Sequence, residues 1–336
     1  MAGARETAIV TTHTESRAPA GIADGRWHAP EIVFWLVPIA AFFVLPDYRI
    51  LGSQILIAGL FVLSLDLILG YAGIVSLGHA AFFGVGAYTA GLLAVHGWGE
   101  PITGLAAAAI VAAVVGYLVS LLVIRGSDLT RLMVTLGVGL MFWELANRAA
   151  SITGGVDGLA GVTMWKLLGL WRFDIAGSTA YVYCLVVLFL MFLVARRLVH
   201  SPLGLSLRGI REGGKRMPAI GAPVGLRLRT IFTVAAAFAG VAGALLAQTT
   251  QFVGIDTLGF PRSGEVLVML VLGGAGRLYG GLIGAALYLI AHDYLAGLSP
   301  VYWQLGLGVL LVIVVLFARG GILGGAASFF ARRSGR

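Results

Sequence analysis

Long runs of apolar residues follow one another along the chain, and polar residues gather between the runs instead of alternating with them. Because a helix that spans a bilayer needs about 20 mostly apolar residues, the pattern predicts an all-α membrane bundle of about eight to ten transmembrane helices. Whether residues 264–275 cross the membrane or dip in and return stays open. The apolar segments cover residues 31–46, 50–70, 79–98, 102–124, 129–150, 179–198, 229–251, 264–275, 278–294 and 301–318.

Polar stretches at both ends delimit the membrane domain. Residues 1–30 are mixed in charge and lack the apolar region and cleavage site of a signal peptide, so we expect a cytoplasmic tail there. Residues 31–320 would form the transmembrane domain. Residues 321–336 would form a second cytoplasmic tail, which is basic.

The overall composition excludes several classes of protein. The chain is 59% hydrophobic and only 11% charged, whereas soluble domains are about 25% charged. Its single cysteine, Cys184, lies inside a predicted helix, so neither a disulfide framework nor a metal site is expected. Motifs typical of hydrolases and of ATP binding do not occur, so we expect no enzyme activity and no cofactor. Any ATP would be used by separate subunits.

The arginines and lysines predict how the helices are oriented. Basic residues of short loops stay on the cytoplasmic side. With both termini in the cytoplasm, 18 of the 23 fall inside. The net charge of +8 therefore reflects topology, and without a soluble basic domain no nucleic acid is expected as a partner. The five that fall outside are Arg49, Arg148, Lys166, Arg172 and Arg262.

Glycines break the predicted helix that would otherwise run through residues 69–91. Gly73 and Gly78 interrupt the apolar run, and Ser76 and His79 lie within the interruption. Non-helical backbone at membrane depth is tolerated only inside protein or beside water, and the ends of half-helices attract polar solutes. A plain cytoplasmic turn between two ordinary helices is the alternative. In that case His79 is a satisfied residue at a helix end.

A second glycine-rich segment resembles the first. The pattern Leu-Gly-x-Ala-Gly occurs at residues 69–73 and again at 272–276, where it includes Gly273 and Gly276. Two broken segments in corresponding halves of a chain point to a transporter core built from repeats. A match of this length also arises easily by chance in a chain with 49 glycines.

Among the polar residues inside predicted spans, three are functional candidates. These are Asp66, Glu144 and Asn147, of which Asn147 follows Glu144 by about one turn on the same helix face. Ionisable residues in a membrane are functional candidates by default, although a packing role is the alternative. We expect Glu144 to face the protein interior. The predicted translocation path comprises Asp66, Gly73, Ser76, Gly78, His79, Glu144, Asn147, Gly273 and Gly276.

The basic connection at 199–228 contains a predicted amphipathic helix. From residue 196 to 229 it holds eight arginines and lysines and one acid. Within 203–212, leucines lie on one face and charged residues on the other, which suits docking into a groove of another protein. The alternative is a basic loop that rests on anionic membrane lipid. The candidate contact residues are Leu203, Leu207, Arg208, Arg211, Glu212 and Gly221.

Residues 70–89 read Gly70-Tyr-Ala-Gly-Ile-Val-Ser-Leu-Gly-His-Ala-Ala-Phe-Phe-Gly-Val-Gly-Ala-Tyr-Thr89. This motif resembles the signature of LivM-type permeases of branched-chain amino-acid ABC transporters. Residues 153–159, 208–221 and 271–280 are similar to that family too. The resemblance runs from about residue 50 to 322.

The resemblance implies a multi-pass subunit in the inner membrane of a bacterium. A second, related permease would complete the pore, two ATPase subunits would dock on cytoplasmic loops, and a periplasmic or extracellular binding protein would deliver the solute. Branched-chain or other amino acids, urea and amides are the implied solutes. Ile74 stands where the family usually has glutamine and Asp66 where it has asparagine, which bears on the substrate.

Two other interpretations stay open at this point. An ion-coupled secondary transporter would use Asp66 and Glu144 as its coupling carboxylates. A structural membrane subunit without a transport path would leave both broken segments unexplained.

Overall fold

The computed structural model describes residues 29–299, apart from 168, 170, 173, 175 and 215, together with 302–306, 308, 309 and 312. Residues 1–28 of the predicted N-terminal tail, the predicted tail at 321–336, and most of the predicted span at 301–318 lie outside the described residues.

The described chain is a bundle of helices, and its strand-like pairing is limited to two isolated bridges, Leu159 with Val253 and Leu167 with Trp171. Every apolar segment predicted between residues 31 and 294 coincides with a helix, which confirms the predicted fold class. The helices are α1 Ala29–Val44, α2 Arg49–Asp66, α3 Ala80–Val95, α4 Pro101–Val123, α5 Asp128–Arg148, α6 Ala150–Thr153, α7 Ser178–Val199, α8 Pro202–Gly213, α9 Val224–Thr250, α10 Phe260–Gly273 and α11 Leu278–Leu298.

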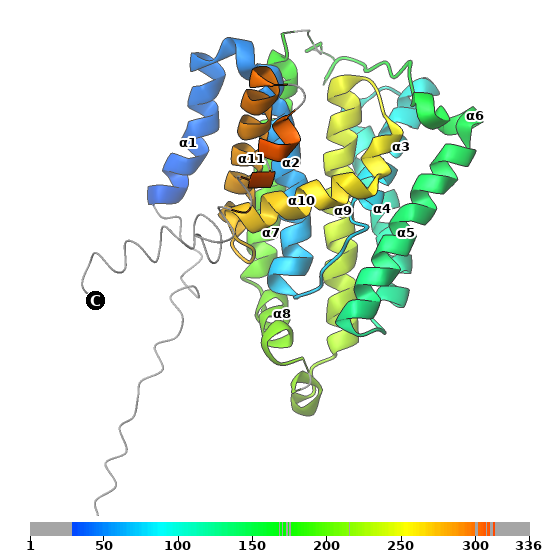
Figure 1. Cartoon of the computed structure of the whole chain (residues 1–336), viewed down its shortest axis with the longest axis vertical. Helices are drawn as coiled ribbons and strands as arrows, with labels where there is room; N and C mark the ends of the chain where they lie inside the picture. Colours follow the sequence, from blue (N-terminus) through cyan, green and yellow to red (C-terminus); the bar gives the residue numbers. More distant parts are fainter. Residues whose placement is uncertain are drawn as a thin grey trace, which may run out of the picture.

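Within the described residues, six helical stretches are long and apolar enough to cross a membrane. They correspond to α2 with its flanking turns, α4, α5, α7, α9 and α11. In contrast, α10 lies across the middle of the bundle (Figure 1). Its 14 residues extend about 21 Å, which is less than the roughly 30 Å of a hydrocarbon core. The segment predicted at 264–275 therefore enters the bundle without crossing it.

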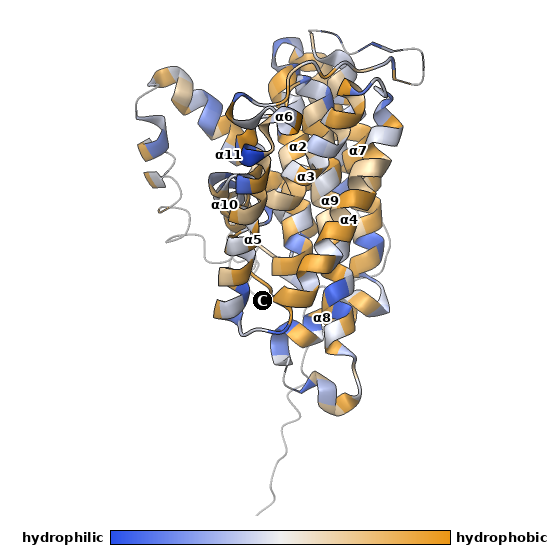
Figure 2. Ribbon diagram, turned by 90° about the vertical axis from the view of Figure 1, so that its right-hand side faces the viewer, coloured by the Kyte–Doolittle hydropathy of each residue, from blue (hydrophilic) through white to orange (hydrophobic). Residues whose placement is uncertain are grey.

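Small residues allow α3, α4 and α9 to pack closely at the centre of the bundle. A side chain at Gly86 of α3 would overlap Gly240 of α9, and one at Gly116 of α4 would overlap the methyl group of Ala236. Membrane helices associate through such close backbone approach. Orange, hydrophobic residues cover most of the middle of the bundle, and blue, hydrophilic residues gather towards its two ends (Figure 2).

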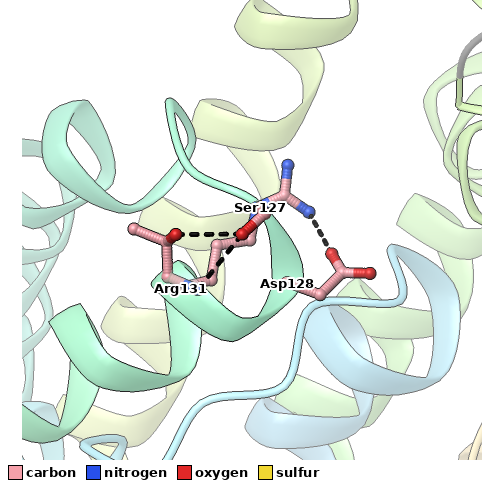
Figure 3. A network of polar contacts seen from close by, with 4 residues as sticks. Ser127, Asp128 and Arg131 are labelled. Carbon is pink, nitrogen blue, oxygen red and sulfur yellow. Dashed lines mark hydrogen bonds and ion pairs between the residues drawn. The ribbon is translucent and has the colours of Figure 1, made fainter.

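Polar contacts fix the start of α5 at the same end of the bundle as α8 (Figure 1). Ser127 is the N-cap, and its hydroxyl accepts a hydrogen bond of 3.4 Å from the backbone N–H of Thr130. Asp128 pairs with Arg131 at 3.0 Å in the first turn (Figure 3). An acid at a helix N-terminus is favoured by the helix dipole. This is the end of the bundle for which the arginine distribution predicts a cytoplasmic location.

Candidate functional site

The glycine-rich interruption is a buried, non-helical segment. After α2, a single π-helical turn, Leu67–Tyr71, is followed by residues 72–79, which run back into the bundle before α3 begins (Figure 1). Ile74, Ser76, Gly78 and His79 are all buried. The segment is therefore not an exposed turn between two complete helices, and α3 begins inside the protein.

His79 is enclosed by its own chain. Its Nε2 lies 2.8 Å from the hydroxyl of Ser64, which donates its own proton to the carbonyl of Phe61 at 2.6 Å. Because the Ser64 proton is already used, the Ser64 hydroxyl accepts from Nε2 of the histidine. The imidazole also stacks on the ring of Phe61 at 5.6 Å. His79 is therefore buried with Nε2 bonded to Ser64, while its Nδ1 has no hydrogen-bond partner within the described residues. The nearby hydroxyl of Ser76 is buried and has no hydrogen-bond partner within the described residues.

The two glycine-broken segments meet each other through Asp66. The carboxylate of Asp66 is fully buried at the end of α2, and its Oδ1 accepts a hydrogen bond of 2.6 Å from the backbone N–H of Gly276. A side chain at Gly70 would overlap both the Asp66 carboxylate and the backbone of Gly276. The sequence similarity between residues 69–73 and 272–276 thus corresponds to a direct contact in space.

Helix α8 joins this contact from the end of the bundle at which α5 begins (Figure 1). The guanidinium of Arg211 donates a hydrogen bond to the carbonyl of Gly70. A Cβ atom at Gly276 would lie 3.0 Å from Nη1 of Arg211, and one at Gly73 would lie 3.1 Å from its Cγ. The guanidinium of Arg208 lies 5.4 Å from the centre of the Tyr71 ring. One helix outside the bundle core therefore touches both broken segments.

The apolar face of α8 packs against its own chain. Leu207 is only 1% exposed and Ile210 is also buried, while Leu203 packs at the edge of the same cluster. This differs from the expected outward-facing leucines, because the helix covers the ends of the membrane helices. Leu205, which the sequence analysis did not select, is 50% exposed, and Glu212 is exposed as well.

Two further predicted path residues serve close packing. A side chain at Gly78 would overlap the carbonyl of Thr135 on α5, and one at Gly273 would overlap the carbonyl of Gly280 on α11. Gly221, in the loop after α8, has a φ of +78° and ends a short 3₁₀ turn. Glycine suits this left-handed conformation because it has no Cβ atom.

Glu144 and Asn147 lie near the opposite end of the bundle from Asp66. The Glu144 carboxylate pairs with Arg148 at 2.6 Å, and its side chain is 46% exposed. We expected Glu144 to face the protein interior, but its side chain is not enclosed by this chain, because the arginine with which it pairs lies at the end of α5. Asn147 is partly buried on the same helix. The carboxylates of Asp66 and Glu144 are thus not brought together.

A cavity of about 680 Å³ lies between α5, α9, α10 and the 3₁₀ turn Ile255–Leu258. On α10, Arg262 Nη1 pairs with Glu265 Oε2 at 2.9 Å. The start of α3 touches the same turn of α10, since the N–H of Ala80 donates to the hydroxyl of Ser263 at 3.0 Å. The cavity is lined by Leu140, Trp143, Leu246, Ile255, Asp256, Thr257, Gly259, Phe260, Pro261, Arg262 and Glu265.

None of the predicted path residues lines this cavity. Arg262 was predicted to lie outside the membrane, because alternating the helices from a cytoplasmic N-terminus places it in an outer loop. The useful signal was the spacing of Arg262 and Glu265 at the start of a segment too short to span. Among the described residues, no group of three or more histidine, cysteine or carboxylate side chains is placed to hold a metal ion.

Comparison with known proteins identifies the family that the sequence matches. Residues 50–316 match the family model described as "Branched-chain amino acid transport system / permease component". No solved structure matches the chain.

Three relatives illustrate the range of similarity. The chain is 31% identical over 284 residues to the high-affinity branched-chain amino acid transport system permease protein LivM of Salmonella typhimurium, a match that covers 78% of this chain and 66% of that relative. It is 24% identical over 283 residues to LivH of Escherichia coli, covering 79% and 90%. A probable LivM of Methanocaldococcus jannaschii is 28% identical over 166 residues, covering 43% and 46%.

The family model covers most of the chain and ends within its last predicted span. The matched region contains both broken segments, the helix α8 and the charged cavity. The chain therefore belongs to the family of permease components of branched-chain amino acid transport systems.

Proposed function

We propose that this chain is a membrane-spanning subunit of a bacterial ABC importer that moves branched-chain amino acids, or similar small polar solutes, by alternating access. ATP would be hydrolysed by separate subunits, because the sequence contains no nucleotide-binding motif. The observation that carries the proposal is the contact of Arg211 on α8 with both glycine-broken segments.

The geometry of α8 suits the transmission of force. Its buried face, which includes Leu207, packs against the membrane helices, and its exposed face is accessible to another protein. A displacement of α8 would reach Gly70 through the Arg211 hydrogen bond and reach Gly276 through side-chain contact. Interfaces and packed cores convert small shifts of this kind into discrete rearrangements.

The partners follow from the same reasoning. A second, related permease would complete the pore, two cytoplasmic ATPase subunits would dock at α8 through residues such as Leu205, and a binding protein outside would supply the solute. The subunit would lie in the inner membrane of a bacterium, with both of its termini in the cytoplasm. The basic residues around α8 would also rest on anionic lipid.

An ion-coupled transporter that uses Asp66 and Glu144 is not favoured. Glu144 is already paired with Arg148 and Oδ1 of Asp66 with the N–H of Gly276, and the ends of α5 and α2 that carry them lie at opposite ends of the bundle (Figure 1). The family description, a permease component of a transport system, also favours a subunit of a larger assembly.

Reconstitution tests the proposal directly. The purified chain would be combined in vesicles with its permease partner, the ATPases and the binding protein, and uptake of leucine, isoleucine, valine, phenylalanine and urea would be measured. We expect uptake that requires both ATP and the binding protein. Uptake driven by an ion gradient without ATPases would contradict the proposal.

Orientation has its own test. A cysteine introduced at the exposed Glu212 should resist an impermeant thiol reagent in intact cells and react after the membrane is opened. Ready labelling in intact cells would reverse the proposed topology.

A further inference from the structure

We propose that the cavity between α5, α9 and α10 holds the charged groups of a zwitterionic α-amino acid during its passage, with Arg262 facing the carboxylate and Glu265 and Asp256 facing the ammonium group. The inference deepens the proposed function and rests on it. It assigns solute recognition to residues that the glycine motifs do not contain.

The paired charges of Arg262 and Glu265 lie on a helix deep in the bundle. Arg262 and Glu265 belong to α10, which lies across the middle of the bundle (Figure 1). Their side chains are 31% and 36% exposed, so both reach the cavity that they line. Charged side chains at membrane depth are costly and usually mark a substrate or ion pathway.

Arg262 retains free hydrogen-bonding capacity. A guanidinium has five N–H donors, and within the described residues the side chain of Arg262 donates one hydrogen bond, to Glu265 at 2.9 Å. Its Cζ also lies 5.5 Å from the centre of the Phe83 ring, which holds the guanidinium in place. The remaining donors suit a carboxylate, which arginine binds with two parallel hydrogen bonds.

A second acid makes the cavity suitable for an ammonium group. Asp256 is exposed at the cavity wall, and its carboxylate accepts no hydrogen bond in the part of the chain that the structure describes. Glu265 and Asp256 together outnumber Arg262 by one charge. A primary ammonium with three donors can be shared between two carboxylates. The set thus offers opposite charges for both ends of a zwitterion.

The rest of the wall is apolar and aromatic. Leu140 and Trp143 come from α5, Leu246 from α9 and Phe260 from the start of α10. These side chains suit a branched aliphatic group. The volume of about 680 Å³ lies within the range of about 300–1,000 Å³ that small-molecule sites occupy. The combination of one charged and one apolar wall matches an aliphatic amino acid.

The simpler alternative is that the pair stabilises only the start of α10. The double variant Arg262→Glu with Glu265→Arg separates the two roles, because it restores an ion pair but reverses the charges. A matched control reverses the Asp128–Arg131 pair, which has the same spacing at the start of α5. Reconstituted complexes would be supplied with saturating leucine-loaded binding protein, and uptake, stimulated ATP hydrolysis and co-purification of the ATPases would be measured.

We expect the reversed α10 pair to assemble but to lose at least about tenfold in maximal uptake, the change that corresponds to one lost hydrogen bond to a charged group. The control should transport as the wild type does. Wild-type uptake by the reversed α10 pair would show that it has only a structural role and would overturn the inference.

Asp256→Asn provides a decision even if the reversed pair does not assemble. The side chain of Asp256 makes no hydrogen bond to another of the described residues, so the variant should fold, and we expect its uptake to fall about tenfold as well. Unchanged uptake in this variant would overturn the role of Asp256. Absence of amino-acid uptake by the wild-type complex would instead contradict the proposed function itself.

Discussion

The carboxylate of Asp66 accepts a hydrogen bond of 2.6 Å from the backbone N–H of Gly276, although 210 residues separate them in the chain. The bond joins the end of α2 to the link between α10 and α11. Gly276 belongs to the second glycine-rich segment and Asp66 lies just before the first, and Arg211 of α8 contacts both segments from outside. The pair is therefore the point where the membrane core meets the helix proposed to receive force from ATP hydrolysis.

Replacement of Asp66 by leucine should destabilise the chain. Gly276 would keep a partly buried N–H without an acceptor, and an unsatisfied donor costs up to about 1–3 kcal/mol when it is fully buried. Asp66→Asn is the matched control, because its amide oxygen can still accept the hydrogen bond. Thermal loss of the monodisperse complex in detergent, followed by size exclusion, would measure the difference. Equal stability of the leucine and asparagine variants would show that the bond contributes little.

A methyl group at Gly70 should be poorly tolerated. The Cβ atom would overlap the Asp66 carboxylate and the backbone of Gly276, and backbone cannot move aside as a flexible side chain can. We expect Gly70→Ala to lower both the yield of folded protein and uptake. Gly225→Ala, on α9, is the control, because no atom lies within 4 Å of its new Cβ. Similar yields for the two variants would contradict the close approach of the broken segments.

Two leucines on α8, two residues apart, should respond differently to aspartate. Leu207 is buried in its own chain, so Leu207→Asp should reduce folding, since a buried charge without a partner costs several kcal/mol. Leu205 is half exposed, so Leu205→Asp should leave the permease folded but release the ATPase. Expression yield and ATPase co-purification distinguish the effects. An ATPase that stays bound to the Leu205 variant would exclude this leucine from the docking surface.

Sequence periodicity predicted the helices well, because lipid requires long apolar runs and each run stands out from its polar flanks. The segment at 264–275 shows where this reasoning ends. Its apolar residues predict a helix, and α10 does form there, but its direction across the bundle depends on contacts with α3 and α11. The length of the segment indicated that it is short for a full span, but it did not indicate where the helix would lie.

The candidate site was predicted less completely for a similar reason. The contact of residues 69–73 with 272–276 follows a pattern visible in the sequence, whereas the partners of Asp66 and Arg211 depend on tertiary packing. The amphipathic pattern of α8 was correct, but the pattern cannot say whether its apolar face covers its own chain or another protein. In the structure, Leu207 lies on the face of α8 that covers its own chain.

Arg211→Ala should separate ATP hydrolysis from transport. The variant removes the hydrogen bond between α8 and the Gly70 carbonyl but leaves the buried face of α8 intact, so the complex should still assemble. The two broken segments would then no longer follow α8, and we expect ATP hydrolysis to continue while uptake falls at least about tenfold, as for the loss of one charge-assisted hydrogen bond. Arg211→Lys keeps the charge and should recover part of the uptake, because lysine can donate to a carbonyl but does not reproduce the arginine fork. If uptake and hydrolysis remained coupled in Arg211→Ala, force would have to reach the membrane helices by another route, and the packing of Leu207 and Ile210 would be the next contact to test.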